Sequence, residues 1–113
     1  MMSQANNALA VVSSVALTLP DVKESRTKRG TNWKVKGRLM ACEAIHKSAE
    51  SHSLMVCVSK EERERLIEEH PDSCYLTDHY RAYDALLVRL AKIDEQALRA
   101  LLESSWRFVR EAA

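Results

Sequence analysis

The chain has 113 residues, a formal net charge of +1 and 46% hydrophobic residues. A chain of this size buries about two-thirds of its unfolded surface and supports a single core, so we expect one domain over residues 1–113. The small net charge excludes a molecule-wide field of the kind that draws a protein to nucleic acid or to an acidic membrane. Any charged binding surface must therefore come from a local cluster.

Such a cluster is present in the first half of the chain. Residues 23–47 hold eight basic and two acidic side chains, a local charge of +6 that leaves the rest of the chain at −5. This asymmetry is compatible with one basic binding face and equally with an ordinary solvated strand surface. The sequence leaves both interpretations open.

Residues 1–19 contain no charged side chain, and apolar residues recur within them at helical spacing. The stretch is shorter than the ~20 residues that cross a bilayer, and no basic residue precedes it as in a signal peptide. We predict a core helix that begins near Ser3 as its N-cap and ends at Pro20. Residues 21–32 show no pattern and predict a mobile connector with a positive-φ turn at Gly30.

The next segments carry strand patterns. Residues 33–42 alternate apolar and basic side chains around Gly37, which predicts a β-hairpin with Trp33 and Val35 facing the core. Residues 54–58 are almost wholly apolar and predict a strand buried on both faces.

Two helix starts are marked by capping residues. Ser59 and Glu62 form a capping box that predicts a short surface helix ending before Pro71. Asp94 precedes a wide apolar stripe at helical spacing and predicts the N-cap of the last helix.

Between these helices, residues 74–76 and 86–90 predict two further strands, with residues 77–84 as a loop or irregular hairpin. The complete pattern predicts an α+β fold. It consists of an antiparallel sheet of four to five strands, with the N- and C-terminal helices packed on one face and a short middle helix.

The cysteines and histidines do not suggest a reactive or metal site. The three cysteines form an odd set without C-x-x-C spacing, which indicates reduced, packed thiols in a cytoplasmic protein. The four histidines have no metal-ligand spacing with the cysteines, and no serine or cysteine pairs with a base. We expect no enzymatic activity, no catalytic residue, no metal and no cofactor.

An ordered set of short segments resembles the MmcQ/YjbR family over nearly the whole chain. The matching segments are residues 16–25, the lysine-rich hairpin with Gly37, residues 58–63, residues 75–77, residues 79–81, residues 87–90 and residues 94–106. The resemblance implies a small CyaY-like α+β fold and a proposed double-wing mode of DNA binding, in which β-hairpins act as wings. The chain departs from the family pattern at Asp78, Ala82, Asp84 and Ala85, where the family has proline, glycine and a proline-tryptophan pair.

If the resemblance extends to function, the basic hairpin contacts phosphates without reading sequence. We then expect weak, salt-dependent binding to double-stranded DNA and no membrane partner. The candidate contact residues are Arg26, Lys28, Arg29, Lys34, Lys36, Arg38, Arg81 and Arg89.

An alternative function is a non-enzymatic module for a small anion or a protein partner, built from His79, Tyr80, Arg81 and Tyr83. A histidine changes charge near neutral pH, and an arginine can hold a carboxylate or phosphate through two parallel hydrogen bonds. The same residues also allow a structural interpretation, in which His79 and Arg81 bond loop carbonyls while a tyrosine packs beneath the loop.

Overall fold

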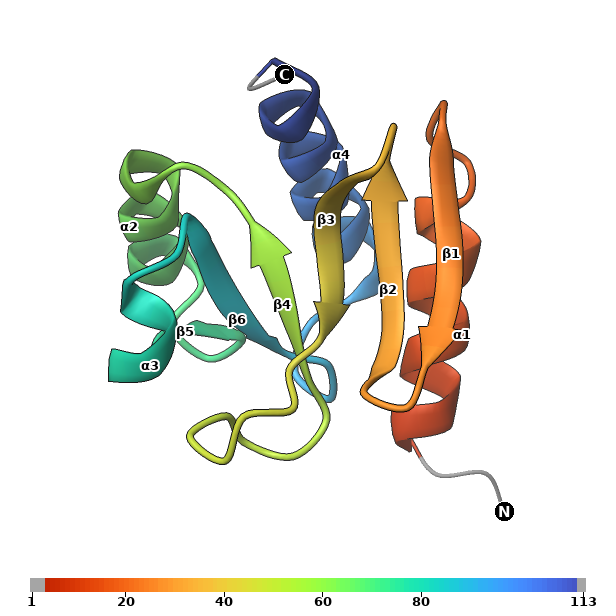
Figure 1. The fold of residues 1–113 in the computed structure, drawn as a ribbon. Helices are drawn as coiled ribbons and strands as arrows, with labels where there is room; N and C mark the ends of the chain where they lie inside the picture. The colour runs from red at the N-terminus through yellow and green to blue at the C-terminus, as the bar shows by residue number, and fades with distance from the viewer. Residues whose placement is uncertain (1–3, 112–113) are drawn as a thin grey trace.

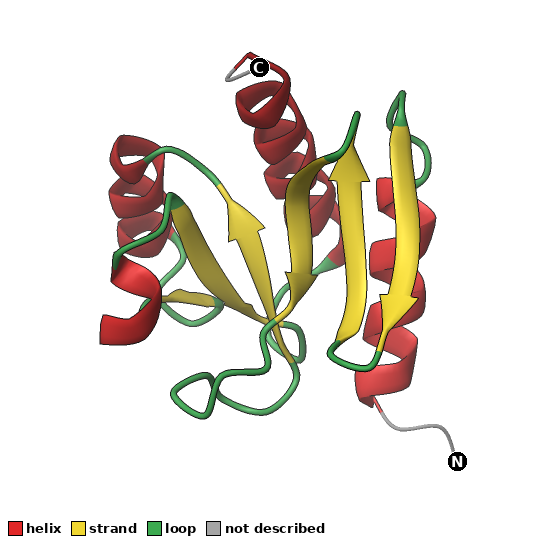
Figure 2. Cartoon of the chain, in the orientation of Figure 1, coloured by secondary structure: helices red, strands yellow, loops and turns green. Residues whose placement is uncertain are grey.

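Within residues 4–111, which the computed structural model describes, the chain forms four helices and one six-stranded antiparallel sheet (Figures 1 and 2). The α+β prediction is confirmed, although the sheet has six strands where four to five were expected. The strand order is β1-β2-β3-β4-β6-β5. The elements are α1 (Gln4–Ala16), β1 (Val22–Thr27), β2 (Gly30–Val35), β3 (Arg38–Glu43), β4 (Ser53–Cys57), α2 (Lys60–Glu69), β5 (Cys74–Tyr75), α3 (Asp78–Arg81), β6 (Ala85–Arg89) and α4 (Glu95–Glu111).

The terminal helices α1 and α4 lie side by side on one face of the sheet, as the sequence predicted (Figure 1). The main core fills the space between these helices and the strands. Its fully buried side chains include Val12, Trp33, Leu86 and Leu102. Leu66 of α2 belongs to the same core, so α2 also anchors on this face.

The opposite face of the sheet is covered over β4 and β6, where a smaller cluster forms around Met55, Tyr80 and Leu87. Tyr80 comes from α3, and the loop of residues 44–52 adds partly buried alanines to the cluster. In the view of Figure 1, α1 and α4 lie behind β1–β3. Among the described residues, no helix covers the other face of these three strands.

Both predicted helix caps are confirmed. The Ser59 hydroxyl accepts the Glu62 N–H at 3.1 Å, and Asp94 Oδ1 accepts the Ala97 N–H at 2.7 Å. The Glu62 carboxylate accepts hydrogen bonds from Arg65 instead of completing the box at Ser59. α2 therefore relies on Ser59 for its side-chain cap.

We expect Ser59→Ala to lower the free energy of unfolding by about 1 kcal/mol, because an N–H at the start of α2 loses its acceptor. Chemical denaturation followed by circular dichroism would measure this change. Ser51→Ala, at an exposed loop position, should be close to neutral. Equal effects of the two substitutions would contradict the cap assignment.

The predicted hairpin is confirmed as β2–β3, with Trp33 and Val35 buried against the helices. Its two turn residues, Lys36 and Gly37, have φ angles of 50° and 84°. Positive φ at both central positions matches the twist of the flanking strands, and the glycine makes the second position favourable. The predicted positive φ at Gly30 is also present, at 109°.

The prediction of a mobile connector over residues 21–32 was wrong. Residues 22–27 form the edge strand β1, which pairs with β2 over six residue pairs. The strand has one partly buried apolar residue, Val22, and is otherwise polar. Backbone hydrogen bonds to β2 hold this strand, and they need no particular side chains. Its sequence therefore lacks the apolar alternation by which a strand is recognised.

Two further boundaries differ from the sequence prediction. α1 ends at Ala16, before Pro20, and the Thr18 hydroxyl donates to the Val15 carbonyl at 2.6 Å in the turn that follows. The predicted N-cap Ser3 lies outside the described residues. Residues 78–81 form the short helix α3 instead of continuing an irregular hairpin.

Candidate nucleic-acid interface

The register of β1 and β2 places Lys23 directly opposite Lys34. Cross-strand partners project from the same face of a sheet, and successive residues alternate between faces. The next pair along the ladder, Glu24 and Trp33, turns toward the helices, where Trp33 is fully buried. Lys23 and Lys34 therefore lie side by side on the uncovered face, and both are exposed.

The acidic residues of β1–β3 are engaged away from this lysine pair. Glu24 Oε1 accepts the Trp33 Nε1–H at 2.7 Å, and Glu43 Oε2 accepts the Thr31 N–H at 2.6 Å. Glu43 pairs with Leu54 of the main core, so it shares the helix side of the sheet. The two carboxylates thus satisfy internal donors, and the lysines face solvent without an acidic neighbour from these strands.

The two hairpin turns add cations at opposite ends of β2. Lys28 and Arg29 form the β1–β2 turn, and Lys36 lies in the β2–β3 turn; all three are exposed. Six residues of β2 separate the turns by about 20 Å. Lys36 Nζ lies 3.9 Å from Asp21 Oδ2, with both side chains more than half exposed, which makes a weak pair. We call Lys23, Lys28, Arg29, Lys34 and Lys36 the basic face.

Two of the predicted contact residues point elsewhere. Arg26 pairs with Thr31 and Arg38 pairs with Val35, and both partners face the helices. Arg38 also lines a small cavity with Val109 and Arg110 of α4, which Lys36 borders from the β2–β3 turn. Lys23, by contrast, belongs to the basic face and was not among the sequence candidates. Recognising residues 22–27 as a strand would have identified it, because the register then sets it opposite Lys34.

Arg89 is already paired with groups of the protein itself. Its guanidinium donates to both carboxylate oxygens of Glu50 at 2.9 and 2.8 Å, and Cζ lies 4.2 Å from the centre of the Tyr75 ring. These hydrogen bonds from Arg89 to Glu50 raise the pKa of Arg89 and lower the pKa of Glu50. A phosphate contact by Arg89 would require breaking this bidentate pair.

The predicted anion-binding segment is divided between surface and core. Tyr80 is 6% exposed, and its hydroxyl accepts the His46 N–H at 3.3 Å, so this tyrosine packs beneath the loop. His79 stacks on His46 with ring centres 3.5 Å apart, and Tyr83 is 52% exposed. Arg81 is exposed and lies 3.7 Å from Asp78. These residues lie at the β4–β6 end of the sheet, away from the basic face.

The histidine pair has a local structural role. His46 Nδ1 contacts both the hydroxyl and the N–H of Ser48, at 2.8 and 3.0 Å. The Ser48 hydroxyl also contacts Thr77 at 2.8 Å. Desolvation, with the neighbouring His79 and Lys47, lowers the pKa of His46 and favours the neutral ring at neutral pH. This arrangement joins the loop of residues 44–52 to the start of α3.

Burial suppresses the reactivity of the thiols. Burial raises the pKa of Cys57 to about 12, and it also raises the pKa values of Cys42 and Cys74. A thiol with a raised pKa stays protonated at neutral pH and is a poor nucleophile and metal ligand. Among the described residues, no group of three or more histidine, cysteine or acidic side chains is placed to hold a metal ion.

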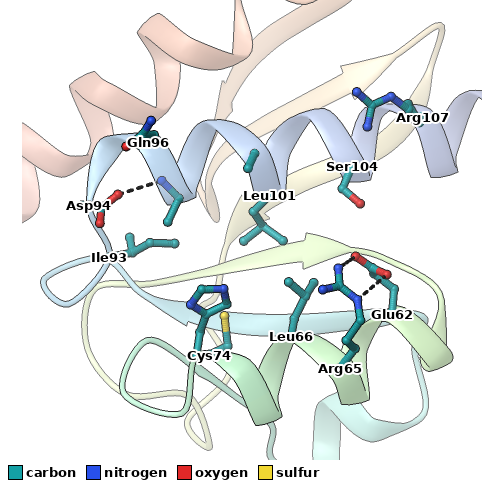
Figure 3. A pocket seen from close by; sticks show the side chains of 13 residues that line it. Glu62, Arg65, Leu66, Cys74, Ile93, Asp94, Gln96, Leu101, Ser104 and Arg107 are labelled. Carbon is teal, nitrogen blue, oxygen red and sulfur yellow. Dashed lines mark hydrogen bonds and ion pairs between the residues drawn. The ribbon is translucent and has the colours of Figure 1, made fainter.

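A groove of about 610 Å³ runs between α2 and α4, with Leu66 and Leu101 in its wall (Figure 3). Several of its charged groups already have partners. Arg65 binds Glu62 and Glu69 on its own helix, and Asp94 caps α4. The groove thus combines apolar surface with charged groups that bond within the protein and with the polar side chains of His70, Gln96 and Ser104.

Comparisons with known proteins agree with this architecture. A family model described as YjbR matches residues 17–108. The crystal structure of Deinococcus radiodurans protein DR2400, whose description names the domain DUF419, is similar with a TM-score of 0.66 and 25% sequence identity. The alignment covers 87% of this chain and 75% of that chain. The search of curated proteins gave no match. Within residues 4–111, no helix is long and apolar enough to cross a membrane.

Proposed function

The chain belongs to the YjbR family, and on that premise we propose that it binds double-stranded DNA without sequence preference through the basic face. The observation that carries this proposal is the Lys23–Lys34 pair on the uncovered side of the sheet. The carboxylates of the same strands bond Trp33 and the Thr31 N–H instead of the lysines.

The span of the basic face suits a phosphate backbone. The two hairpins share β2 and present their turns about 20 Å apart, with the lysine pair between them. At an axial rise of about 3.4 Å per base pair, this length matches about six base pairs of duplex, so the turns and the lysine pair can reach phosphates along one side of it. Lysine and arginine contacts of this kind position a protein on DNA but carry no base readout.

The salt dependence of binding tests this proposal. If all five cations of the basic face contact phosphates, log K should fall against log salt with a slope of about −4 to −5. Fluorescence anisotropy with a random-sequence duplex, repeated over a range of potassium chloride concentrations, measures the slope. A second duplex of unrelated sequence should give the same affinity. Absent binding at low salt, or binding insensitive to salt, would refute the proposal.

We further propose that the protein acts by binding and not by catalysis. The thiols are held protonated by burial, as the raised pKa of Cys57 indicates. His46 Nδ1 is hydrogen-bonded to the hydroxyl of Ser48 and accepts the Ser48 N–H. An activated nucleophile needs a base that is itself oriented by a third group, whereas this histidine contact closes a turn.

A further inference from the structure

A second cavity, of about 470 Å³, lies beside α2 on the side away from the α2–α4 groove. Its volume falls within the usual range for small-molecule sites. The lining is mixed, with apolar side chains, two arginines and two glutamates. The lining residues are Arg63, Glu64, Ile67, Glu68, Pro71, Cys74, Tyr75, Leu76 and Arg81.

Arg63 is the unusual member of this lining because its side chain is a buried charge, 6% exposed. Its Nη1 donates to three backbone carbonyls in the segment joining α3 to β6, those of Arg81, Tyr83 and Ala85. Among the described residues, no carboxylate forms an ion pair with it. A buried cation without a counter-ion is costly, and carbonyl dipoles offset only part of that cost.

The hydrogen bonds of Arg63 also leave one edge of the guanidinium free. All three come from Nη1, and Nε is buried without any partner in the described part of the chain. Nε and Nη2 together form the edge that grips a carboxylate through two parallel hydrogen bonds. The protein thus fixes one side of the guanidinium and leaves the bidentate side without a partner.

We propose that this cavity binds a small organic monocarboxylate with an apolar body, its carboxylate accepting from Nη2 of Arg63 and, after a small turn of the guanidinium, from Nε. Arg81, which lines the same cavity, supplies a second cation, and its only ion pair with a described residue is the exposed contact to Asp78. Ile67, Leu76 and Tyr75 provide apolar surface for the body of the ligand.

The apolar part of the lining distinguishes the ligand from a plain anion. Glu64 and Glu68 also line the cavity from α2, so its two arginines and two glutamates balance in formal charge. Inorganic phosphate has no apolar body to pack against Ile67 and Leu76, which favours an organic carboxylate. This site is separate from the basic face and does not depend on DNA binding.

A nuclear magnetic resonance titration with sodium benzoate at constant ionic strength tests the proposal. We expect saturable amide shifts for residues around the cavity, including Ile67 and Leu76, with half-saturation below about 10 mM. Benzamide, which keeps the ring but lacks the charge, and inorganic phosphate should each bind at least about tenfold more weakly. No saturable shift with benzoate, or equal binding of benzamide or phosphate, would overturn the proposal.

Substitutions of the two arginines test whether they bind the carboxylate. Arg63→Lys keeps the charge but loses the bidentate edge, and should weaken benzoate binding about tenfold. Arg81→Gln should weaken it about threefold to tenfold. Arg65→Gln, on the same helix but outside this cavity, is the matched control and should change nothing. If Arg63→Lys does not fold, Arg81→Gln decides, since its side chain is exposed. Unchanged binding in Arg81→Gln, or an equal loss in Arg65→Gln, would refute the site.

Discussion

The double substitution Lys23→Glu/Lys34→Glu should weaken binding to duplex DNA by about a hundredfold to a thousandfold at low salt. A charge about 4 Å from a phosphate in water contributes about 1 kcal/mol, so reversing it changes the interaction by about 2 kcal/mol. Two reversals at adjacent positions give about 4 kcal/mol, which is close to a factor of a thousand. Anisotropy titration at fixed salt measures the change, and the residual salt slope should drop by about 2.

The matched control is Lys60→Glu/Lys92→Glu, which changes the net charge by the same amount. Both residues are exposed and lie outside β1–β3. Because exposed charges more than about 10 Å from the bound phosphates are screened, this variant should lose less than about tenfold. If the two double variants lose equal affinity, binding reports net charge alone and the basic face is not the site. Circular dichroism should confirm that both variants remain folded.

The basic face illustrates what the sequence could and could not predict. The β2–β3 hairpin was predictable because Trp33 and Val35 alternate with basic residues around Gly37, whose positive φ closes the turn. The edge strand β1 was not predictable from periodicity. Only Val22 and Glu24 of this strand are partly buried. Glu24 accepts a hydrogen bond from Trp33 and makes no apolar contact that a hydrophobic pattern would reveal.

The missed strand changed the composition of the candidate site. Without the pairing of β1 with β2, the excess of basic residues over residues 23–47 can only be assigned to one surface. The register divides that run between two faces, so Arg26 and Arg38 leave the site while Lys23 enters it. Pairing between strands is a tertiary property, and a shift by one residue would exchange the two sets.

Arg63 was missed for a different reason. It lies in a helix whose sequence is mostly charged, KEERERLIEE, and a charge in such a helix normally faces solvent. Only the fold brings the carbonyls of residues 81–85 over α2, where they accept from Nη1. The Ser59 cap of the same helix, in contrast, depends on residues three apart in the chain and was predictable.

Trp33→Ala should lower the free energy of unfolding by about 3–5 kcal/mol, the largest effect on stability that we expect from a single substitution. The indole is fully buried between β2 and the helices, so its removal leaves a cavity in the main core. Urea denaturation measures the loss. Trp106→Ala is the matched control: Trp106 is only partly buried, and its Nε1–H donates to the Pro20 carbonyl at 2.8 Å. An equal or larger loss in Trp106→Ala would contradict the assignment of Trp33 to the core.

Trp33→Phe separates the two roles of this indole. Phenylalanine keeps most of the buried ring but removes the donor to Glu24, so we expect a smaller loss of about 1–3 kcal/mol. The substitution leaves the Glu24 carboxylate without its indole donor, but the carboxylate carries the same charge in both proteins. Glu24 pairs with Trp33 on the helix side of the sheet, whereas Lys23 and Lys34 lie on the uncovered face. DNA affinity should therefore stay within about twofold while stability falls. A large loss of DNA binding in folded Trp33→Phe would contradict this separation of the two faces.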